Sequence, residues 1–249
     1  MIIVTAGDHR HGTDSSGSAE TDGVSFRDMI AASEAQAKKF GYRTMIYDLG
    51  GLGIGKPFSV DDETFRTHGY YRKVSSNYFS KALHKPDIVA ACMAESDDFT
   101  VYLDGDAVLW KPIDDVVGDY DIAVTVRHPR ELKLMDKFIK QNPEAMGLIN
   151  AGVIFFQPSD RVKRFLATWK ERSMEGGSDQ LALNQLLGPD SPAAVNTTQE
   201  KLGLRVKYLP TDTYNFYYFD YGNRPLPDTV RVMHFKAGVR RFFRTYFPA

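Results

Sequence analysis

The sequence has one cysteine among its 249 residues, which excludes an internal disulfide. A lone Cys92 fits a reduced, cytosolic setting, and we expect it to be a small buried residue on a helix rather than a catalytic one. No apolar run reaches 18 residues, and no basic start precedes a long apolar run, so we predict neither a membrane span nor a signal peptide. The formal net charge of -1 gives no indication of a nucleic acid partner.

The composition that remains is that of an ordinary soluble domain, with 43% hydrophobic and 25% charged residues. The length suits one domain over residues 1–249, ending in a basic and aromatic tail at 239–249. Segments with strand and helix patterns alternate, which predicts an α/β fold with a central, mixed but mostly parallel sheet flanked by helices. We expect strands near residues 2–4, 44–47, 99–103, 107–110, 121–126, 149–156, 204–209 and 230–235, and helices near 26–40, 77–94, 131–141, 161–172 and 180–187.

Two of the expected elements contain residues that should disturb them. Pro86 lies inside the segment 77–94 and is expected to break that helix, because proline lacks the N–H that an interior helical position donates. Ala151 and Gly152 interrupt the otherwise apolar strand at 149–156.

The most informative segment is the apolar strand at 99–103, which leads into Asp104, Gly105 and Asp106. In extended chain, residues i and i+2 point to the same side, so both carboxylates can converge on one cation. Ligand sites of open α/β sheets lie at this carboxyl end of the strands, and Gly105 lets a ligand approach the backbone. We therefore predict a cation site here, with a solvated acidic turn as the alternative.

The same local pattern occurs on the nucleophile strand of haloacid-dehalogenase-type phosphatases. Those enzymes carry it on their first strand, whereas here it follows two expected strands and two expected helices. They also need a later pair of aspartates, which Asp119 and Asp121 match only in part. A phosphatase is therefore kept as an alternative function.

Four segments, in order along the chain, resemble the GT-A glycosyltransferases, and among them the family of glycogenin and the bacterial galactosyltransferases (glycosyltransferase family 8-like). These segments are 102–106 (Tyr-Leu-Asp-Gly-Asp), 150–154 (Asn-Ala-Gly-Val-Ile), 179–184 (Asp-Gln-Leu-Ala-Leu-Asn) and 234–238 (His-Phe-Lys-Ala-Gly). The resemblance covers about residues 1–6 and 85–238 and does not extend to residues 8–70 or the tail. It implies a GT-A fold and transfer of a hexose from a UDP-sugar to a hydroxyl of a carbohydrate, glycolipid or protein acceptor.

The resemblance also implies a metal site on the donor diphosphate. Asp104 and Asp106 would supply oxygen ligands and His234 a nitrogen ligand to a divalent cation, which offsets the charge of the leaving group. Mixed carboxylate and imidazole ligands suit Mn²⁺, with Mg²⁺ as the alternative. Without the resemblance, His234 would be interpreted as a hydrogen-bonded histidine near a strand end.

Further candidates for donor binding follow from the other segments. Asn150 interrupts an apolar strand, so its amide needs partners, either sugar hydroxyls or a backbone cap. By resemblance, Asp179 and Gln180 lie beside the anomeric carbon as catalytic residues, while Ser178 or Asp179 also fits a helix N-cap. The full set of donor-binding candidates is Thr5, Ala6, Asp8, Lys85, Asp104, Gly105, Asn150, Ala151, Gly152, Lys236 and Gly238.

The two lysines in this set are candidates for phosphate contacts. Lys236 departs from the spacing of the family, in which the lysine follows the glycine, so Arg240 or Arg241 is an alternative to it.

The segment at Asp179 and Gln180 resembles retaining enzymes, and retention of configuration is therefore expected.

An inverting enzyme needs a carboxylate base on the acceptor side. No segment clearly supplies one, although Asp121 and Asp136 are candidates.

A catalytically silent module that binds nucleotide-sugars is a further alternative function. The presence of the metal-ligand candidates and of Asp179 argues against it.

The tail interleaves Arg240, Arg241 and Arg244 with four aromatic residues. Basic and aromatic side chains together favour anionic membrane surfaces, so one prediction is a peripheral contact with the inner face of a membrane. The other prediction is a tail that packs on the domain.

The aromatic segment 214–221 is expected to pack in the core, with a sugar-stacking platform as the alternative.

Overall fold

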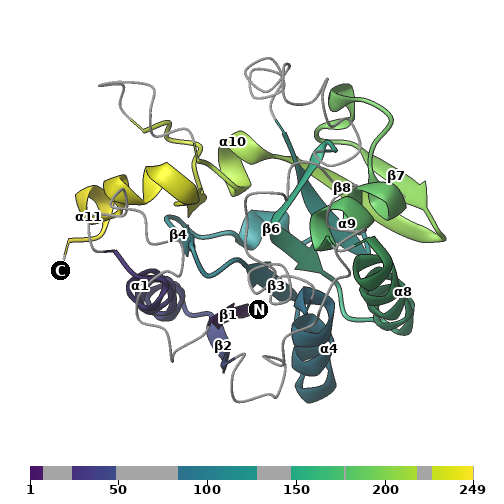
Figure 1. Ribbon diagram of the computed structural model, residues 1–249, viewed down its shortest axis with the longest axis horizontal. Helices are drawn as coiled ribbons and strands as arrows, with labels where there is room; N and C mark the ends of the chain where they lie inside the picture. Colours follow the sequence, from purple (N-terminus) through teal and green to yellow (C-terminus); the bar gives the residue numbers. More distant parts are fainter. Residues whose placement is uncertain (8–23, 49–83, 128–146, 177, 218–225, 249) are drawn as a thin grey trace.

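The computed structural model describes residues 1–7, 24–48, 84–127, 147–176, 178–217 and 226–248 (Figure 1). Within these residues, seven strands form a central sheet in the order β2-β1-β3-β6-β5-β8-β7. Five of these seven run in one direction, whereas β6 and β7 are antiparallel to their neighbours, so the predicted mixed, mostly parallel sheet is confirmed. The strands are β1 (Ile2–Gly7), β2 (Arg43–Asp48), β3 (Thr100–Leu103), β5 (Ile122–Val126), β6 (Ile149–Phe156), β7 (Thr198–Lys201) and β8 (Leu204–Pro210).

A second, two-stranded sheet continues from the end of β3. It pairs β4 (Ala107–Leu109) with β9 (Val232–His234) in antiparallel fashion. The expected strand at 230–235 is therefore shorter than predicted, and it brings a late segment of the chain next to the segment after β3.

Helices cover both faces of the central sheet and give the layered α/β arrangement seen in Figure 1. One face packs against α4, α8 and α9, with Trp169 fully buried among them. The other face packs against α1 and α10. The helices are α1 (Phe26–Lys39), α4 (Lys85–Glu95), α8 (Asp160–Gly176), α9 (Asp179–Leu187), α10 (Thr211–Tyr214) and α11 (Phe243–Tyr246), with 3-10 helices η3 (Asp114–Val116), η4 (Pro192–Ala194) and η5 (Ala237–Phe242).

The structure shows how the two disturbing positions are accommodated. The described helix α4 begins at Lys85, so Pro86 lies in its first turn, where the missing N–H has no partner to lose. Strand β6 is continuous through Ala151 and Gly152, but its pairing with β5 shifts there, from Val124 opposite Ile154 to Thr125 opposite Asn150. The part of the expected helix at 77–83 and the whole helix at 131–141 lie outside the described residues.

The tail packs on the domain through its aromatic side chains. Phe243 and Phe247 are buried in a cluster with Val108 of β4, Met29 of α1 and Phe235. The prediction of a packed tail is thus confirmed for these side chains. Cys92 is buried on α4, as expected. None of the described helices combines the length and apolarity needed to cross a membrane.

Candidate active site

Asp104 and Asp106 lie in a tight turn directly after β3. The N–H of Ala107 donates to the carbonyl of Asp104 at 2.8 Å, which closes the turn. The extended-chain argument for the convergence of the two carboxylates is therefore wrong, because a turn and not a strand holds them. Gly105 sits in a close contact, since a Cβ there would lie 3.2 Å from the carbonyl oxygen of Ala6 at the end of β1.

The pairing of β4 with β9 brings His234 to this turn. Ala107 is the register partner of His234, and the N–H of Phe235 donates to the carbonyl of Asp106 at 2.7 Å. As a result, His234 Nε2 lies 3.0 Å from Asp106 Oδ1. Because β4 and β9 are separated by more than 120 residues of sequence, only the folded chain brings these side chains together.

The geometry of Asp104, Asp106 and His234 fits a divalent cation. One potential ligand atom from each residue lies within 4.8 Å of the other two. In an octahedral site with bonds of about 2.1 Å, adjacent ligand atoms lie about 3 Å apart, which is the separation of His234 Nε2 and Asp106 Oδ1. Two carboxylates and an imidazole are a donor set that Mn²⁺ accepts.

Space for an ion at this cluster depends on Gly152. A Cβ at this position would lie 2.4 Å from His234 Cε1 and 3.1 Å from Asp104 Oδ2, so a side chain would fill the gap between two candidate ligands. The backbone is held in place by the N–H of Asp104, which donates to the carbonyl of Gly152 at 2.8 Å.

Each carboxylate is oriented by a basic neighbour. Lys85 Nζ lies 2.9 Å from Asp104 Oδ1, which also accepts a hydrogen bond of 3.2 Å from the hydroxyl of Tyr102. The buried guanidinium of Arg240 donates to Asp106 Oδ2 at 3.4 Å. One oxygen of each carboxylate is thus bound by a donor from the protein, and Asp106 Oδ1 and Asp104 Oδ2 remain on the side of His234 and Gly152.

Burial and charge compete in setting the pKa values at this cluster. Burial acts to raise the pKa of Asp106, but the adjacent His234, a backbone hydrogen bond and the charge of Lys85 together lower that pKa below its ordinary value. Burial lowers the pKa of Arg240 to about 10, which leaves the guanidinium charged at neutral pH. Asp106 is therefore ionised at neutral pH and able to bind a cation.

Lys85 links the metal-ligand candidates to Asp179. Its ammonium group lies 2.8 Å from Asp179 Oδ2 and 3.2 Å from the carbonyl of Ala151, in addition to Asp104. Burial acts to lower the pKa of Lys85, but the two carboxylates hold it well above its usual range. Burial raises the pKa of Asp179, against the opposite effect of Lys85. All three ammonium hydrogens have acceptors within the protein, and a phosphate contact by Lys85 stays a prediction.

Asp179 and Gln180 begin helix α9 beside strand β6. Ser178 is the N-cap, and its side chain accepts a hydrogen bond of 3.1 Å from the N–H of Leu181, so the N-cap interpretation is confirmed for Ser178. Gln180 Oε1 accepts a hydrogen bond of 3.4 Å from the N–H of Ala151. The two catalytic candidates therefore lie next to the Asn-Ala-Gly segment.

Asn150 Nδ2 on β6 and Thr5 Oγ1 near the end of β1 are buried polar atoms that have no hydrogen-bond partner in the described part of the chain. The other side-chain atom of Asn150, Oδ1, accepts from the N–H of Gly152 at 3.0 Å. Because buried polar groups ordinarily have partners, a bound ligand is a candidate partner for both atoms.

The remaining candidates are placed less closely or not at all. Ala6 lies at the end of β1 against Gly105, and Gly238 lies in η5. The ammonium group of Lys236 forms a cation–π contact with the buried Tyr217, at 3.3 Å from its ring centroid. Asp8 and Asp136 lie outside the described residues.

Asp121 lies at the opposite end of the sheet from the cluster. It directly precedes β5, where Ile122 pairs with Phe156 at the far end of β6 from Asn150. Its carboxylate binds Arg161 and accepts from the N–H of Arg205. It is therefore too far from the cluster to serve as a base there.

Sequence reasoning missed the side chains that support the candidate ligands. From the sequence, Tyr102 belongs to a strand and to the segment 102–106, and Asn215 belongs to an aromatic segment, and neither pattern indicates a contact with a candidate ligand. Asn215 is fully buried and contacts His234 Nδ1 at 2.8 Å. A single asparagine among the aromatic residues of 214–217 is the signal that could have identified it.

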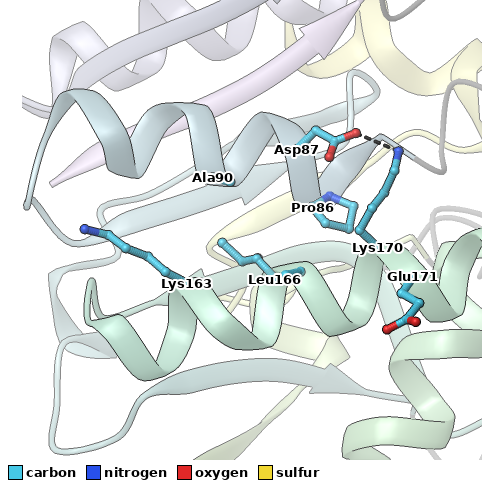
Figure 2. A pocket seen from close by; sticks show the side chains of 8 residues that line it. Pro86, Asp87, Ala90, Lys163, Leu166, Lys170 and Glu171 are labelled. Atoms are coloured by element: carbon cyan, nitrogen blue, oxygen red, sulfur yellow. Dashed lines mark hydrogen bonds and ion pairs between the residues drawn. The ribbon is translucent and has the colours of Figure 1, made fainter.

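A separate groove lies between α4 and α8 (Figure 2), with a volume of about 390 Å³. Lys170 and Asp87 form an ion pair of 2.6 Å at its edge, and its floor is formed by apolar residues such as Leu166. None of the candidate site residues lines this groove. The chemistry predicted from the sequence therefore belongs to the cluster at the end of β3.

Comparison with solved structures supports the fold. The chain is similar to a glycosyltransferase involved in the glycosylation of the major capsid of PBCV-1, with a TM-score of 0.55, 13% identity, and coverage of 99% of this chain and 98% of that one. The galactosyltransferase LgtC, in complex with donor and acceptor sugar analogs, gives a TM-score of 0.52, 17% identity, and coverage of 99% and 95%. The apo form of the glycosyltransferase GlyE of Streptococcus pneumoniae TIGR4 gives a TM-score of 0.51 and 15% identity, and the match covers 100% of this chain and 60% of that one.

Comparison with curated proteins found no significant match. Comparison with family models matched the nucleotide-diphospho-sugar transferase model over residues 98–239. This match spans more than half of the chain and includes Asp104, Asp106, Asp179 and His234. The phosphatase alternative is thereby excluded, and the chain belongs to the nucleotide-diphospho-sugar transferase family, as a glycosyltransferase of the GT-A fold.

Proposed function

We propose that this glycosyltransferase is metal-dependent and transfers a hexose from a UDP-sugar to an acceptor hydroxyl with retention of configuration. The observation that carries the proposal is the convergence of Asp104, Asp106 and His234 within 4.8 Å, beside the buried Asp179. The acceptor is a hydroxyl of a carbohydrate, a glycolipid or a protein.

Asp104, Asp106 and His234 would hold Mn²⁺, with Mg²⁺ as the alternative. When bound, the cation would offset the negative charge that develops on the diphosphate as the sugar leaves. Arg240 adds a buried positive charge at Asp106, on the side of the cluster away from His234. This charge is fixed before the reaction begins, so it would favour an anionic leaving group without reorganisation. Lys236 and Gly238 are the other candidates for the diphosphate.

The donor sugar and nucleoside would bind at the carboxyl ends of β1 and β3 and at Asn150. Asn150 Nδ2 and Thr5 Oγ1 are buried donors without partners in the described residues, and both can bind hydroxyl or carbonyl oxygens. Ala6 lies next to Gly105, whose lack of a side chain leaves room for the carbonyl oxygen of Ala6. These positions support a nucleotide-sugar as the ligand that completes the hydrogen bonding of this edge.

Asp179 is the residue we assign to the sugar side of the reaction. The ammonium group of Lys85 lies 2.8 Å from Asp179 Oδ2 and also forms an ion pair with Asp104. Lys85 therefore fixes Asp179 next to the metal-ligand cluster. There it would stabilise the positive charge of the sugar in the transition state, while Gln180 supports the Asn-Ala-Gly segment. The leaving diphosphate would accept the proton of the acceptor; a covalent sugar intermediate on Asp179 is the other route to retention.

A thermal-shift panel of nucleotide-sugars, each with and without Mn²⁺, tests the function. A ligand at 100 times its Kd adds about 2.7 kcal/mol to the free energy of unfolding, and each kcal/mol raises the Tm by about 2–4 °C for a protein of this size. We expect one UDP-sugar to raise the Tm by several degrees only when Mn²⁺ or Mg²⁺ is present. A panel without any metal-dependent rise would refute the proposal.

Proton NMR of the first-formed product tests the stereochemistry separately. With a UDP-α-sugar as donor, the proposal predicts an α-linked product. A β-linked product would overturn retention and the role of Asp179, while the metal and diphosphate assignments would stand.

Membrane contact through residues 239–249 remains a prediction. The exposed side chains of Arg241 and Arg244 are the residues that could provide it, because Phe243 and Phe247 are buried. Flotation with anionic liposomes tests the idea by comparing the full chain with a variant in which both arginines are replaced by glutamine. Equal flotation of the two proteins would eliminate the contact.

A further inference from the structure

A continuous chain of buried hydrogen bonds begins at the candidate ligand His234 and ends at the backbone of Asn150. His234 Nδ1 lies 2.8 Å from Asn215 Oδ1, and Asn215 Nδ2 donates to Thr125 Oγ1 at 2.8 Å. Thr125 Oγ1 in turn donates to the carbonyl of Asn150 at 3.0 Å. Asn215 and Thr125 are fully buried, so water does not compete for these bonds.

The direction of every bond in this chain is fixed by its last member. The carbonyl of Asn150 can only accept, so the single hydroxyl hydrogen of Thr125 must point at it. Toward Asn215, Thr125 Oγ1 can then only accept, which requires the NH₂ group of Asn215 to face it. The amide oxygen of Asn215 is thereby turned to His234.

An amide oxygen only accepts, so His234 Nδ1 must carry a hydrogen. In a neutral imidazole with a hydrogen on Nδ1, the lone pair that can bind a metal is on Nε2. Nε2 is the nitrogen that lies 3.0 Å from Asp106 Oδ1, on the side of the carboxylates. The chain of bonds therefore selects the nitrogen that faces the cation site.

The surrounding backbone keeps Asn215 at this place. The N–H of Asn215 donates to the carbonyl of Thr211, and the neighbouring N–H of Phe216 donates to the carbonyl of Val232. The N–H of His234 donates to the carbonyl of Phe216 at 2.7 Å. Thr125 comes opposite Asn150 because the β5–β6 pairing shifts between Val124 and Thr125.

We propose that Asn215, oriented by Thr125, is a positioning residue that fixes the imidazole of His234 so that Nε2 is its metal-binding atom. This inference rests on the proposed function, because it presupposes that the cluster binds a cation. Residues that hold a metal-binding histidine by its second nitrogen ordinarily change metal affinity by 10–100-fold when they are replaced. The shift in β5–β6 pairing thereby has a function. It places Thr125 opposite Asn150, so that the hydroxyl of Thr125 donates to the carbonyl of Asn150 and can only accept a hydrogen bond from Asn215.

The test measures Mn²⁺ affinity in the presence of UDP by EPR, and nitrogen coordination to the bound Mn²⁺ by electron spin echo modulation. Asn215→Leu removes both the acceptor and the donor, whereas Asn215→Asp keeps an oxygen for Nδ1–H. The second pair acts one bond further away, where Thr125→Val removes the hydroxyl and Thr125→Ser keeps it. Thermal unfolding without metal establishes that each variant is folded, and the Thr125 pair decides the question if Asn215→Leu does not fold.

We expect the wild-type Mn²⁺ to show coupling to an imidazole nitrogen. Asn215→Leu and Thr125→Val should weaken Mn²⁺ binding by about 10-fold or more and reduce the nitrogen coupling, whereas Asn215→Asp and Thr125→Ser should restore most of both. Wild-type affinity and coupling in Asn215→Leu and Thr125→Val would overturn the inference and leave the proposed function intact. A wild-type protein that binds no Mn²⁺ in the presence of UDP would overturn the proposed function and this inference with it.

Discussion

Gly152 is the residue whose replacement tests the cation site most locally. A Cβ there would lie 2.4 Å from the ring of His234, which is buried and bonded to Asn215. We predict that Gly152→Ala lowers Mn²⁺ affinity at least about 10-fold, because a displaced ligand loses its geometry, at a cost in stability of about 1–3 kcal/mol. EPR titration of Mn²⁺ with UDP measures the affinity.

Gly176→Ala is the matched control, because the nearest side-chain atom to a Cβ there is Leu181 Cδ2 at 3.9 Å. It should leave Mn²⁺ affinity unchanged. Equal affinities in the two variants would show that the ion does not bind between Asp104 and His234.

Asp179 should matter more for turnover than for binding. The charge of its carboxylate would stabilise the transition state, so Asp179→Asn is expected to lower kcat on the order of 10²-fold and to change donor affinity only a few-fold. Lys85 keeps a carboxylate partner in Asp104, which preserves the fold. Initial rates and UDP-sugar binding would be compared with Asp190→Asn, a control at a carboxylate that is 89% exposed.

If Asp179→Asn instead weakened binding as much as it lowered kcat, Asp179 would be a binding residue and not a catalytic one.

At the scale of single residues, the sequence identified the polar groups that the turn after β3 brings together. It did not identify Asn215, Thr125 or Tyr102, because their roles depend on which strand and helix lie next to which.

At the scale of elements, the N-terminal cap of helix α1 offers a test of local stability. Ser25 is the N-cap, and its side chain accepts from the N–H of Asp28, while the Asp28 carboxylate accepts from the N–H of Ser25 at 2.9 Å. This second bond lowers the pKa of Asp28 below 3.8, although burial opposes it. Replacing Ser25 by alanine should lower the free energy of unfolding by about 1 kcal/mol.

The pH dependence of this cap has a defined sign. Because the folded-state pKa of Asp28 is lower than the unfolded value of 3.8, its stabilisation is present above pH 3.8 and is lost as the pH falls through the folded-state pKa. We predict that wild type is more stable than Asp28→Asn at pH 7 and that the difference shrinks in strong acid. Denaturant unfolding at several pH values measures it, and a difference that grows with acidity would contradict the assignment.

The elements themselves could be predicted from the sequence to within a few residues where the apolar pattern is clear, as in the amphipathic helix α8 and the continuously apolar strand β6. Two details could not. The position of Pro86 in a first turn depends on where α4 begins, and the sequence shows only that a proline is present. The shift in β5–β6 pairing depends on strand order, which places the late-occurring β6 between β3 and β5.

At the scale of the whole molecule, the tail joins the first helix to the second sheet. Phe243 is 1% exposed, and its ring centroid lies 5.3 Å from that of Phe235. We predict that Phe243→Ala lowers the free energy of unfolding by about 3–5 kcal/mol. The exposed Thr245→Ala should change it by less than about 0.5 kcal/mol. Denaturant unfolding that gave equal values for both variants would show that the tail is not part of the core.

The arrangement of the whole chain explains why the candidate site has no single sequence motif. Its groups come from the ends of β1 and β3, from β6, from the starts of α4 and α9, and from β9 and η5. The sheet order brings these ends to one edge, which a short segment of sequence does not reveal. The four segments that resemble other glycosyltransferases carry many of the polar side chains of this edge, and Lys85 and Arg240 add to them from outside these segments.

Isothermal titration calorimetry of UDP, with and without Mn²⁺, tests the central claim most directly. We predict that Mn²⁺ raises the affinity of the wild-type protein for UDP and that Asp106→Asn abolishes this increase. The control Asp98→Asn, at an exposed carboxylate paired with Arg43, should retain it. An affinity for UDP that is the same with and without Mn²⁺, or an increase that survives in Asp106→Asn, would contradict the account.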